Sequence, residues 1–158
     1  MPWWPRSLGF ARVPVVAAEE HAVSERTLVL IKPDAVRRGL VGEILARYER
    51  RGLSIVVMDQ RVIDETLSDA HYAEHVDKPF YPDLREFITG GPLVAMVLAG
   101  DSAIEVVRAM NGATDARKAE PGTVRGDLAL STSENLVHAS DSAESAVREI
   151  DLWFPALA

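Results

Sequence analysis

The sequence predicts an α+β fold, a sandwich in which a four-stranded sheet is covered by helices on one face. Three observations lead to this expectation. Short β-rich runs alternate or pair with amphipathic helical segments, nothing repeats at a period of about 20 to 50 residues, and 158 residues suit one domain with a buried core. Apolar residues make up 47% of the chain and charged residues 26%, which is ordinary for a globular protein.

Four runs are predicted to form the strands of the sheet. They are rich in β-branched and other apolar residues, and turn-forming residues bound them. They cover residues 27–33 (TLVLIKP), 53–63 (LSIVVMDQRVI), 93–100 (LVAMVLAG) and 134–140 (ENLVHAS). The first run stops at Pro33, because proline cannot donate to a sheet ladder.

The first helix is predicted between the first two strands, over residues 42–52. Ile44, Leu45 and Tyr48 recur at helical spacing and would form its apolar face. Gly52 suits the position just after the helix, where a left-handed backbone is common.

Two short helices are predicted before the third strand, and a longer one after it. The first spans residues 67–76 with Ser68 as its expected cap, and the second spans residues 83–90 and ends in a Gly-Gly-Pro sequence. The longer helix covers residues 102–112. Its apolar face would consist of Ile104, Val107 and Met110.

The last helix is predicted over residues 141–154, after a long connection. Residues 112–134 are punctuated by Gly and Pro and are expected to be mostly irregular, and loops of that length in a compact domain are usually functional. Asp141 and Glu144 have the spacing of a capping box. The side chains expected to point inward are Ala143, Val147, Ile150 and Phe154.

Residues 1–24 differ in composition from the rest and form a separate N-terminal extension. They hold three of the nine prolines and two of the three tryptophans, without sustained periodicity. Arg12 and Pro14 interrupt any apolar core of a secretory signal. We expect either a disordered tail or a translation start nearer to Val23, with the folded domain over residues 25–158.

Composition also excludes several classes of function. The chain has no cysteine, so thiolate nucleophiles, disulfides and cysteine metal sites are excluded. A net charge of −7 argues against nucleic-acid binding, which needs a cationic face. No apolar run approaches the length of a membrane span, so we expect no membrane partner and a cytoplasmic location.

The histidines are the first candidates for chemistry. His21 lies in the N-terminal extension, and His71 and His75 are four apart on a predicted helix but lack an obvious third metal ligand, which favours a place on the helix surface. His138 differs, because its neighbours are small and a helix begins just after it. The small neighbours leave room for a ligand to approach, and the free N–H groups of a helix N-terminus favour an anion. A purely structural histidine is the alternative at this position.

Three cations are candidates for binding an anion beside His138. Lys32 ends the first strand, Arg108 lies on the helix after the third strand, and Arg125 lies in the long connection. Each alone would usually be a solvated surface charge. Together they would neutralise a polyphosphate and stabilise a phosphoryl group in transfer. Neither GxxxxGK[ST] nor GxGxxG occurs, so side chains would have to hold the phosphates, and a histidine can carry the phosphoryl group covalently.

Several blocks of the sequence, in order, resemble the nucleoside diphosphate kinase family. NLVHASDS (residues 135–142) resembles its active-site signature, Asn-x-x-His-(Gly/Ala)-Ser-Asp-(Gly/Ser/Ala). Further blocks of the same kind are ERTLVLIKPDAV, HYAEHVDKPFY, GGPLVAMVLAG, the helix that carries Arg108, PGTVRGD and ESAVREIDLWFP. The resemblance runs from about Glu25 to Pro155 and implies a ferredoxin-like βαββαβ core with a four-stranded antiparallel sheet.

The resemblance implies transfer of the γ-phosphoryl group from a nucleoside triphosphate, mainly ATP, to a nucleoside diphosphate. The reaction would be ping-pong through a phosphohistidine at His138, with broad base specificity, and would maintain the NTP and dNTP pools. Mg²⁺ would bind with the nucleotide, and the protein itself would hold no metal. The partners would be ATP and nucleoside diphosphates, and the chain would form a homo-oligomer, a hexamer or a tetramer.

The family's roles carry over to matching positions of this sequence. His138 would attack through Nδ1, and Glu149 and Ser140 would orient it. Phe80 would stack on the base, and Tyr72 would position the transferring group. Asp141 would cap the last helix and touch the water shell of the metal without ligating it. The remaining nucleotide contacts would come from Lys32 and Asn135 at the sugar and phosphates, and from Arg108, Thr114 and Arg125 at the β and γ phosphates.

The sequence departs from the family pattern at three positions. Ala116 stands where a proline is usual, Glu134 adds a negative charge before the signature asparagine, and Ala139 replaces a common glycine. The first puts the stability of the long connection and of assembly in doubt. None removes a catalytic group. The alternative is a noncatalytic nucleotide-binding or regulatory module of the same fold, since fold alone does not establish function.

Overall fold

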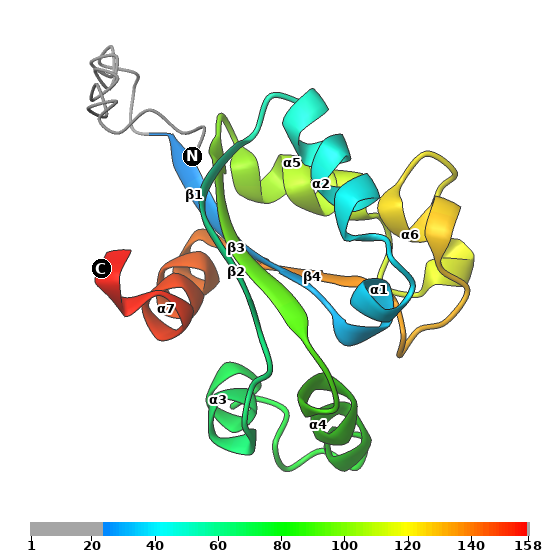
Figure 1. Cartoon of the computed structure of the whole chain (residues 1–158), viewed down its shortest axis with the longest axis vertical. Helices are drawn as coiled ribbons and strands as arrows, with labels where there is room; N and C mark the ends of the chain where they lie inside the picture. The colour runs from blue at the N-terminus through cyan, green and yellow to red at the C-terminus, as the bar shows by residue number, and fades with distance from the viewer. Residues whose placement is uncertain (1–23, 158) are drawn as a thin grey trace, which may run out of the picture.

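A computed structural model describes residues 24–157, and Figure 1 shows how their elements are arranged. The strands form one sheet, and the helices lie on both sides of it. The elements are β1 (Glu25–Ile31), α1 (Pro33–Arg37), α2 (Val41–Arg50), β2 (Ser54–Arg61), α3 (Glu65–His71), α4 (Tyr81–Thr89), β3 (Leu93–Gly100), α5 (Ala103–Asn111), η1 (Ala116–Lys118), α6 (Val124–Leu128), β4 (Val137–Ala139), α7 (Ala143–Trp153) and η2 (Pro155–Leu157).

The sheet has the strand order β2-β3-β1-β4, and every neighbouring pair is antiparallel. β1 is therefore a central strand between β3 and the short β4. In the β1–β4 ladder Leu30 lies opposite His138, so the buried part of β1 fixes the backbone of this histidine. The predicted α+β class and the antiparallel ferredoxin-like arrangement are confirmed.

Helices cover both faces of the sheet, which differs from the expectation of one covered face. Val29 and Ile31 belong to a core that includes residues of α2 and α5, whereas Leu28 and Leu30 pack with residues of α4 and α7. All four side chains have no exposed surface. The sequence carries this signal, because a continuous apolar run without alternation is typical of a strand that is buried on both faces.

The start of α3 differs from the prediction. Asp64, and not Ser68, is the N-cap, and its side chain accepts a hydrogen bond from the N–H of Leu67 at 2.8 Å. Ser68 lies inside the helix, fully buried, with its Oγ 3.0 Å from the hydroxyl of Tyr81. Both residue types can cap a helix, so propensity alone did not distinguish them.

The last helix also begins and faces differently from the prediction. Ser142 is its N-cap and accepts from the N–H of Ser145, so the Asp141–Glu144 capping box is wrong. Ile150 and Phe154 are buried as expected, but Ala143 and Val147 are exposed, Val147 by 63%. The buried stripe instead consists of Ala146, Glu149, Ile150 and Trp153. Both possible stripes contain Ile150, and the observed one turns Glu149 inward.

The long connection is more ordered than expected. Within residues 112–134 lie η1 and α6, and Val124 of α6 is fully buried. Thr123 caps α6 by accepting from the N–H of Gly126. Ala116, which replaces the usual proline, packs into the core on the α2–α5 face with 4% exposure. Its methyl group is thus used in packing, and the expected loosening of assembly remains a prediction.

The interpretation of residues 1–24 falls outside the described residues except for Ser24. Among the described residues, none of the helices has the length and apolarity that a bilayer crossing requires.

Because both faces of β1 are buried, truncating a side chain on either face should destabilise the protein to a similar degree. We expect Leu30→Ala and Ile31→Ala each to lower the free energy of unfolding by about 2 to 5 kcal/mol, the usual range for such truncations. Val147→Ala is the control and should change it by less than about 0.5 kcal/mol, as for most surface changes. Urea unfolding at fixed protein concentration measures all three. A small loss for either β1 variant would contradict the two-sided core.

Candidate active site

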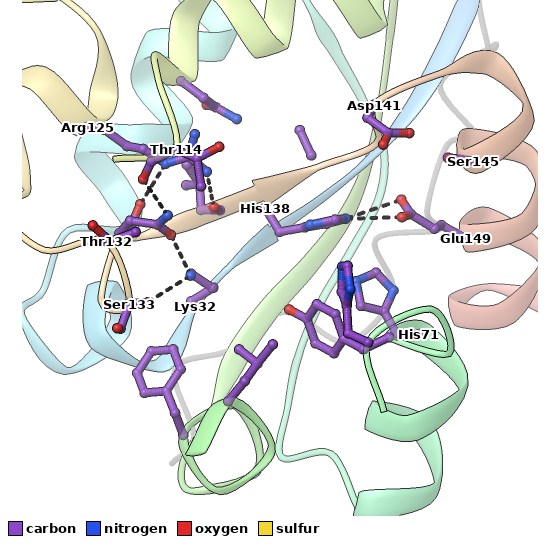
Figure 2. Close-up of a pocket in the computed structure, with 18 of the residues that line it drawn as sticks. Lys32, His71, Thr114, Arg125, Thr132, Ser133, His138, Asp141, Ser145 and Glu149 are labelled. Carbon is purple, nitrogen blue, oxygen red and sulfur yellow. Dashed lines mark hydrogen bonds and ion pairs between the residues drawn. The ribbon is translucent and has the colours of Figure 1, made fainter. Parts of the chain in front are cut away.

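The predicted site residues gather around one cavity of about 730 Å³. Its walls come from the end of β1, from α3 to α5, from the connection between α5 and β4, and from α7 (Figure 2). Ser140 is the only predicted residue that does not line it, and lies behind Glu149. The lining residues that were predicted are Lys32, Tyr72, Phe80, Arg108, Thr114, Arg125, Asn135, His138 and Glu149.

His138 is the middle residue of β4, and its imidazole extends toward α7. Nε2 lies 3.2 and 3.3 Å from the two carboxylate oxygens of Glu149. An ionised carboxylate only accepts hydrogen bonds, so Nε2 is the nitrogen that carries the proton. Nδ1 of the neutral ring is left with a lone pair. The side chain of His138 keeps 25% of its surface exposed, so a ligand in the cavity can reach the imidazole.

Glu149 is buried but has hydrogen-bond donors for its charge. Its side chain is 6% exposed and accepts from the Ser140 hydroxyl at 2.6 Å, while Ser140 Oγ accepts from the N–H of Leu28 in β1. Burial alone would raise the pKa of this carboxyl, but the hydrogen bond from His138, the positive charge of this ring when it is protonated, and the hydrogen bond from Ser140 lower the pKa overall. Glu149 therefore stays ionised and holds one tautomer of His138.

Lys32 is a buried cation at the end of β1. Its Nζ donates to Asn135 Oδ1 at 2.5 Å and to the carbonyl oxygen of Ser133 at 3.3 Å. Burial lowers the pKa of this amine to about 8; the charge of Asp34 opposes the shift, and that of Arg125 adds to it. The amine is thus poorly compensated in the free protein and favours an incoming anion.

Arg125 holds the surrounding backbone in place. Its guanidinium donates to the carbonyl oxygens of Asn135, Gly112 and Val137 at 3.1, 2.8 and 2.6 Å. The Asn135 amide in turn donates to the carbonyl oxygen of Thr114 at 2.9 Å. Burial lowers the pKa of Arg125 from a very high value, so it remains charged. These bonds fasten the connection to β4.

Other predicted residues lie at the opening of the cavity. Arg108 is exposed on α5, and Phe80 is 51% exposed, with its ring 5.7 Å from that of His75. Tyr72 ends α3 with its ring 6.4 Å from that of His138, and burial raises the pKa of its hydroxyl. The hydroxyl therefore keeps its proton and can act as a donor.

His71 is a site residue that sequence reasoning missed. It was expected on the helix surface, yet it is 5% exposed and its ring lies edge-to-face against His138 at 4.6 Å. Trp153 Nε1 donates to its Nδ1 at 3.1 Å, so the proton of His71 is on Nε2. Burial, and then the charge of His138, lower its pKa to about 3, so it is neutral. The sequence signal that could have identified His71 as a site residue is its neighbour Tyr72, which had already been assigned to the site.

The same cluster has the composition of a metal site, but its protonation opposes that use. Ligand atoms of His71, His138 and Glu149 lie within 4.8 Å of one another. A histidine that ligates a metal usually donates its other ring N–H to an acceptor. Here Trp153 is a donor at Nδ1 of His71, which keeps the proton on Nε2. The geometry therefore favours a hydrogen-bonded cluster.

An imidazole with a free lone pair, a carboxylate that orients it and cations around a cavity are the parts that phosphoryl transfer needs. The fold and the site thus define a phosphotransferase. The family profile described as nucleoside diphosphate kinase matches residues 25–158. The chain belongs to the nucleoside diphosphate kinase family.

Individual relatives agree with this assignment. The chain is 68% identical over 135 residues to the nucleoside diphosphate kinase of a Nocardioides species, covering 85% of this chain and 100% of that protein. It is 62% identical to the one from Rhodococcus erythropolis, with coverages of 85% and 98%. A solved structure from Halobacterium salinarum in complex with CDP superposes with a TM-score of 0.81 at 50% identity, covering 83% and 88% of the two chains.

The protein is thus an enzyme that transfers the terminal phosphoryl group of a nucleoside triphosphate to a nucleoside diphosphate. The alternative of a noncatalytic module has no support, because these relatives carry the name of the kinase and the cavity keeps His138 and its cationic neighbours.

The buried amine of Lys32 predicts one abnormal lysine titration. Lys32 should lose its proton near pH 8 in the folded protein. In the unfolded chain the same amine titrates near 10.5. Between about pH 8 and 10.5 the unfolded state therefore binds the extra proton, and this residue makes stability rise with pH. Carbon-13 NMR of lysine labelled at Cε measures the titration of Lys32.

The variant Lys32→Met assigns the abnormal signal, which must disappear from its spectrum. If all signals of the native enzyme titrate above pH 10, Lys32 is not desolvated as the structure indicates.

Proposed function

We propose that the reaction is ping-pong and passes through a phosphohistidine at Nδ1 of His138. The lone pair of Nδ1 attacks the γ-phosphorus of a nucleoside triphosphate, mainly ATP, and the bond from that phosphorus to the β-phosphate oxygen breaks. The nucleoside diphosphate leaves with that electron pair. A second diphosphate then attacks the phosphorus with a terminal oxygen, and the P–N bond breaks. The carrying observation is the bond between Nε2 of His138 and Glu149, which leaves Nδ1 as the nucleophile.

The carboxylate of Glu149 would also stabilise the positive charge that develops on the imidazole during the first step. As the P–N bond forms, the imidazole becomes cationic, and an ionised carboxylate at 3.2 Å stabilises it. Ser140 keeps this carboxylate in place through its 2.6 Å hydrogen bond. Tyr72, still protonated, donates from the α3 side of the cavity to the group in transfer. These groups need little rearrangement during the reaction.

The nucleotide is proposed to lie along the cavity from Phe80 to His138. Lys32 and Asn135, already hydrogen-bonded to each other, would bind the sugar hydroxyls and phosphates. Phe80 would stack on the base, and stacking accepts every base, which supports broad specificity and a role in maintaining NTP and dNTP pools. The β and γ phosphates would be held by Arg108, Thr114 and Arg125.

Mg²⁺ is proposed to enter with the nucleotide. This ion keeps several waters and is usually held through phosphates and one or two carboxylates, and it neutralises charge on the phosphate chain. Asp141 lines the cavity, and hydrogen bonding to Ser145 lowers the pKa of its carboxyl. An ionised Asp141 can accept a hydrogen bond from water on the metal without ligating it.

A homo-oligomer, a hexamer or a tetramer, is proposed to form through β2. This strand ends the sheet, so one of its edges has no partner strand among the described residues. Val56 and Met58, two positions apart and therefore on one side of the strand, are 39% and 45% exposed. An apolar sheet edge favours pairing with another chain. The enzyme is proposed to act in the cytoplasm on free nucleotides, without nucleic-acid or membrane partners.

Labelling tests the phosphohistidine directly. Purified enzyme incubated with γ-labelled ATP and Mg²⁺ should acquire acid-labile, base-stable label, and GDP should remove it as GTP. His138→Ala should take up none, because it lacks the attacking nitrogen. His75→Ala is the matched control, since His75 also lines the cavity but has no proposed role, and should be labelled. Native, folded enzyme that never carries label would contradict the ping-pong route.

A charge on the β2 edge tests the proposed assembly. Met58→Asp should shift the enzyme toward smaller species in light scattering coupled to size-exclusion chromatography, because apolar pairing would bury a carboxylate. Val147→Asp is the control, since Val147 is 63% exposed and lies on α7. An unchanged mass for Met58→Asp, or an equal loss in both variants, would argue against the β2 interface.

A further inference from the structure

A strained turn stands immediately before the strand that carries His138. Leu136 has φ 75°, a left-handed value that is unusual for a bulky residue, and its side chain is fully buried. The N–H of Val137 donates to the carbonyl oxygen of Asn135 at 2.9 Å. A bond from residue i+2 to residue i around such a φ is a γ-turn of the rare, strained kind. Turns of this kind persist only when the surroundings hold them.

One short segment holds both polar backbone groups of Leu136. The N–H of Lys32 donates to its carbonyl oxygen at 2.8 Å, and its own N–H donates to Oδ2 of Asp34 at 3.1 Å. Asp34 is 1% exposed and lies in α1, two residues after Lys32. The side chain of Asp34 therefore completes the pair of hydrogen bonds that clamps the turn.

The turn decides where two site residues point. On one side of Leu136, the Asn135 side chain bonds Lys32 Nζ and the carbonyl oxygen of Thr114. On the other side, the chain enters β4 and reaches His138, which faces Glu149 (Figure 2). A relaxed backbone at Leu136 would rotate these two side chains relative to each other.

Asp34 also affects the charge of Lys32. Its second oxygen, Oδ1, is buried and has no hydrogen-bond partner among the described residues. The charged groups that act on Lys32 are Asp34 and Glu134, which favour its protonated form, and Arg125, which opposes it. Glu134 is exposed and paired with Arg37 at 3.3 Å, so the buried carboxylate is the stronger compensation.

We propose that Asp34 is a positioning residue of the kinase: its carboxylate clamps the γ-turn at Leu136, which aligns Asn135 with His138, and its charge keeps Lys32 protonated for the nucleotide. This role rests on the proposed function of His138 as the nucleophile.

Two substitutions separate the two parts of the role. Asp34→Asn keeps an oxygen that can accept from Leu136 and removes the charge, and Asp34→Ala removes both. For Asp34→Ala we expect a fall of about 100-fold in the rate of His138 labelling, as for a misplacement of about 1 Å. For Asp34→Asn we expect a labelling rate within about threefold of native at pH 6.5, since the clamp remains. Rapid-quench labelling with γ-labelled ATP measures both.

The pH profile of kcat/KM is the second readout, which a purely structural role would not move. In Asp34→Asn the alkaline limb should move to lower pH by about one unit, because loss of a buried carboxylate lowers the pKa of Lys32 further. Glu134→Gln is the matched control: it also removes a negative charge near Lys32, but an exposed one, so its limb should move much less.

Either of two results overturns the proposal. One is an alkaline limb in Asp34→Asn that does not move or moves no more than in Glu134→Gln; the other is a folded Asp34→Ala with native labelling rate and native profile. If Asp34→Ala does not fold, the Asp34→Asn profile decides alone. A failure of the His138 mechanism is distinguishable, because then the native enzyme itself takes up no label.

Discussion

The buried carboxylate of Glu149 is the constraint on which the site depends. A charge that is removed from water is tolerated only when donors surround it. Here the donors, His138 and Ser140, lie in and just after β4, and Ser140 is itself held by the backbone N–H of Leu28 in β1. Satisfying this one carboxylate therefore fixes α7 against the sheet, orients the imidazole and selects its tautomer. Structure and reactivity at His138 have the same physical cause.

Within residues 24–157, the two buried cations of the cavity, Lys32 and Arg125, lack the charged partner that Glu149 can have in His138. Burial lowers the pKa of both Lys32 and Arg125, and neither is paired with a carboxylate at hydrogen-bond distance among the described residues. Neutral acceptors hold them instead, namely Asn135 and backbone carbonyl oxygens. Because neutral acceptors do not cancel charge, Lys32 and Arg125 keep their positive charges for a polyphosphate. The chain as a whole is acidic, with a net charge of −7, so this positive charge is local.

Local patterns in the sequence allowed most of the fold to be predicted and pointed to His138, Lys32, Arg108 and Arg125, because strand runs and strand ends carry their information in few residues. The other five of the nine cavity residues were assigned only through the resemblance to the family, and they also line the cavity: Tyr72, Phe80, Thr114, Asn135 and Glu149. What failed depended on distant contacts. The inward stripe of α7 could run through Val147 or through Ala146, since both contain Ile150, and only the pairing of Glu149 with β4 decides between them. The place of His71 depends on Trp153, which lies 82 residues later in the chain.

The sequence has no glycine-rich phosphate loop, but close approach of chain segments still requires a glycine in the connection between α5 and β4. Gly112 has φ 80°, and a Cβ there would lie 2.4 Å from Thr123 Oγ1, so only glycine fits and its carbonyl oxygen can meet Arg125. Arg125 bonds that carbonyl together with those of Asn135 and Val137, on both sides of Leu136. The guanidinium of Arg125 and the carboxylate of Asp34 thus hold the same turn, the first through the carbonyl oxygens of Asn135 and Val137 and the second through the N–H of Leu136. In the proposed mechanism, anion binding and the placement of the nucleophile are therefore coupled through one strained residue, Leu136.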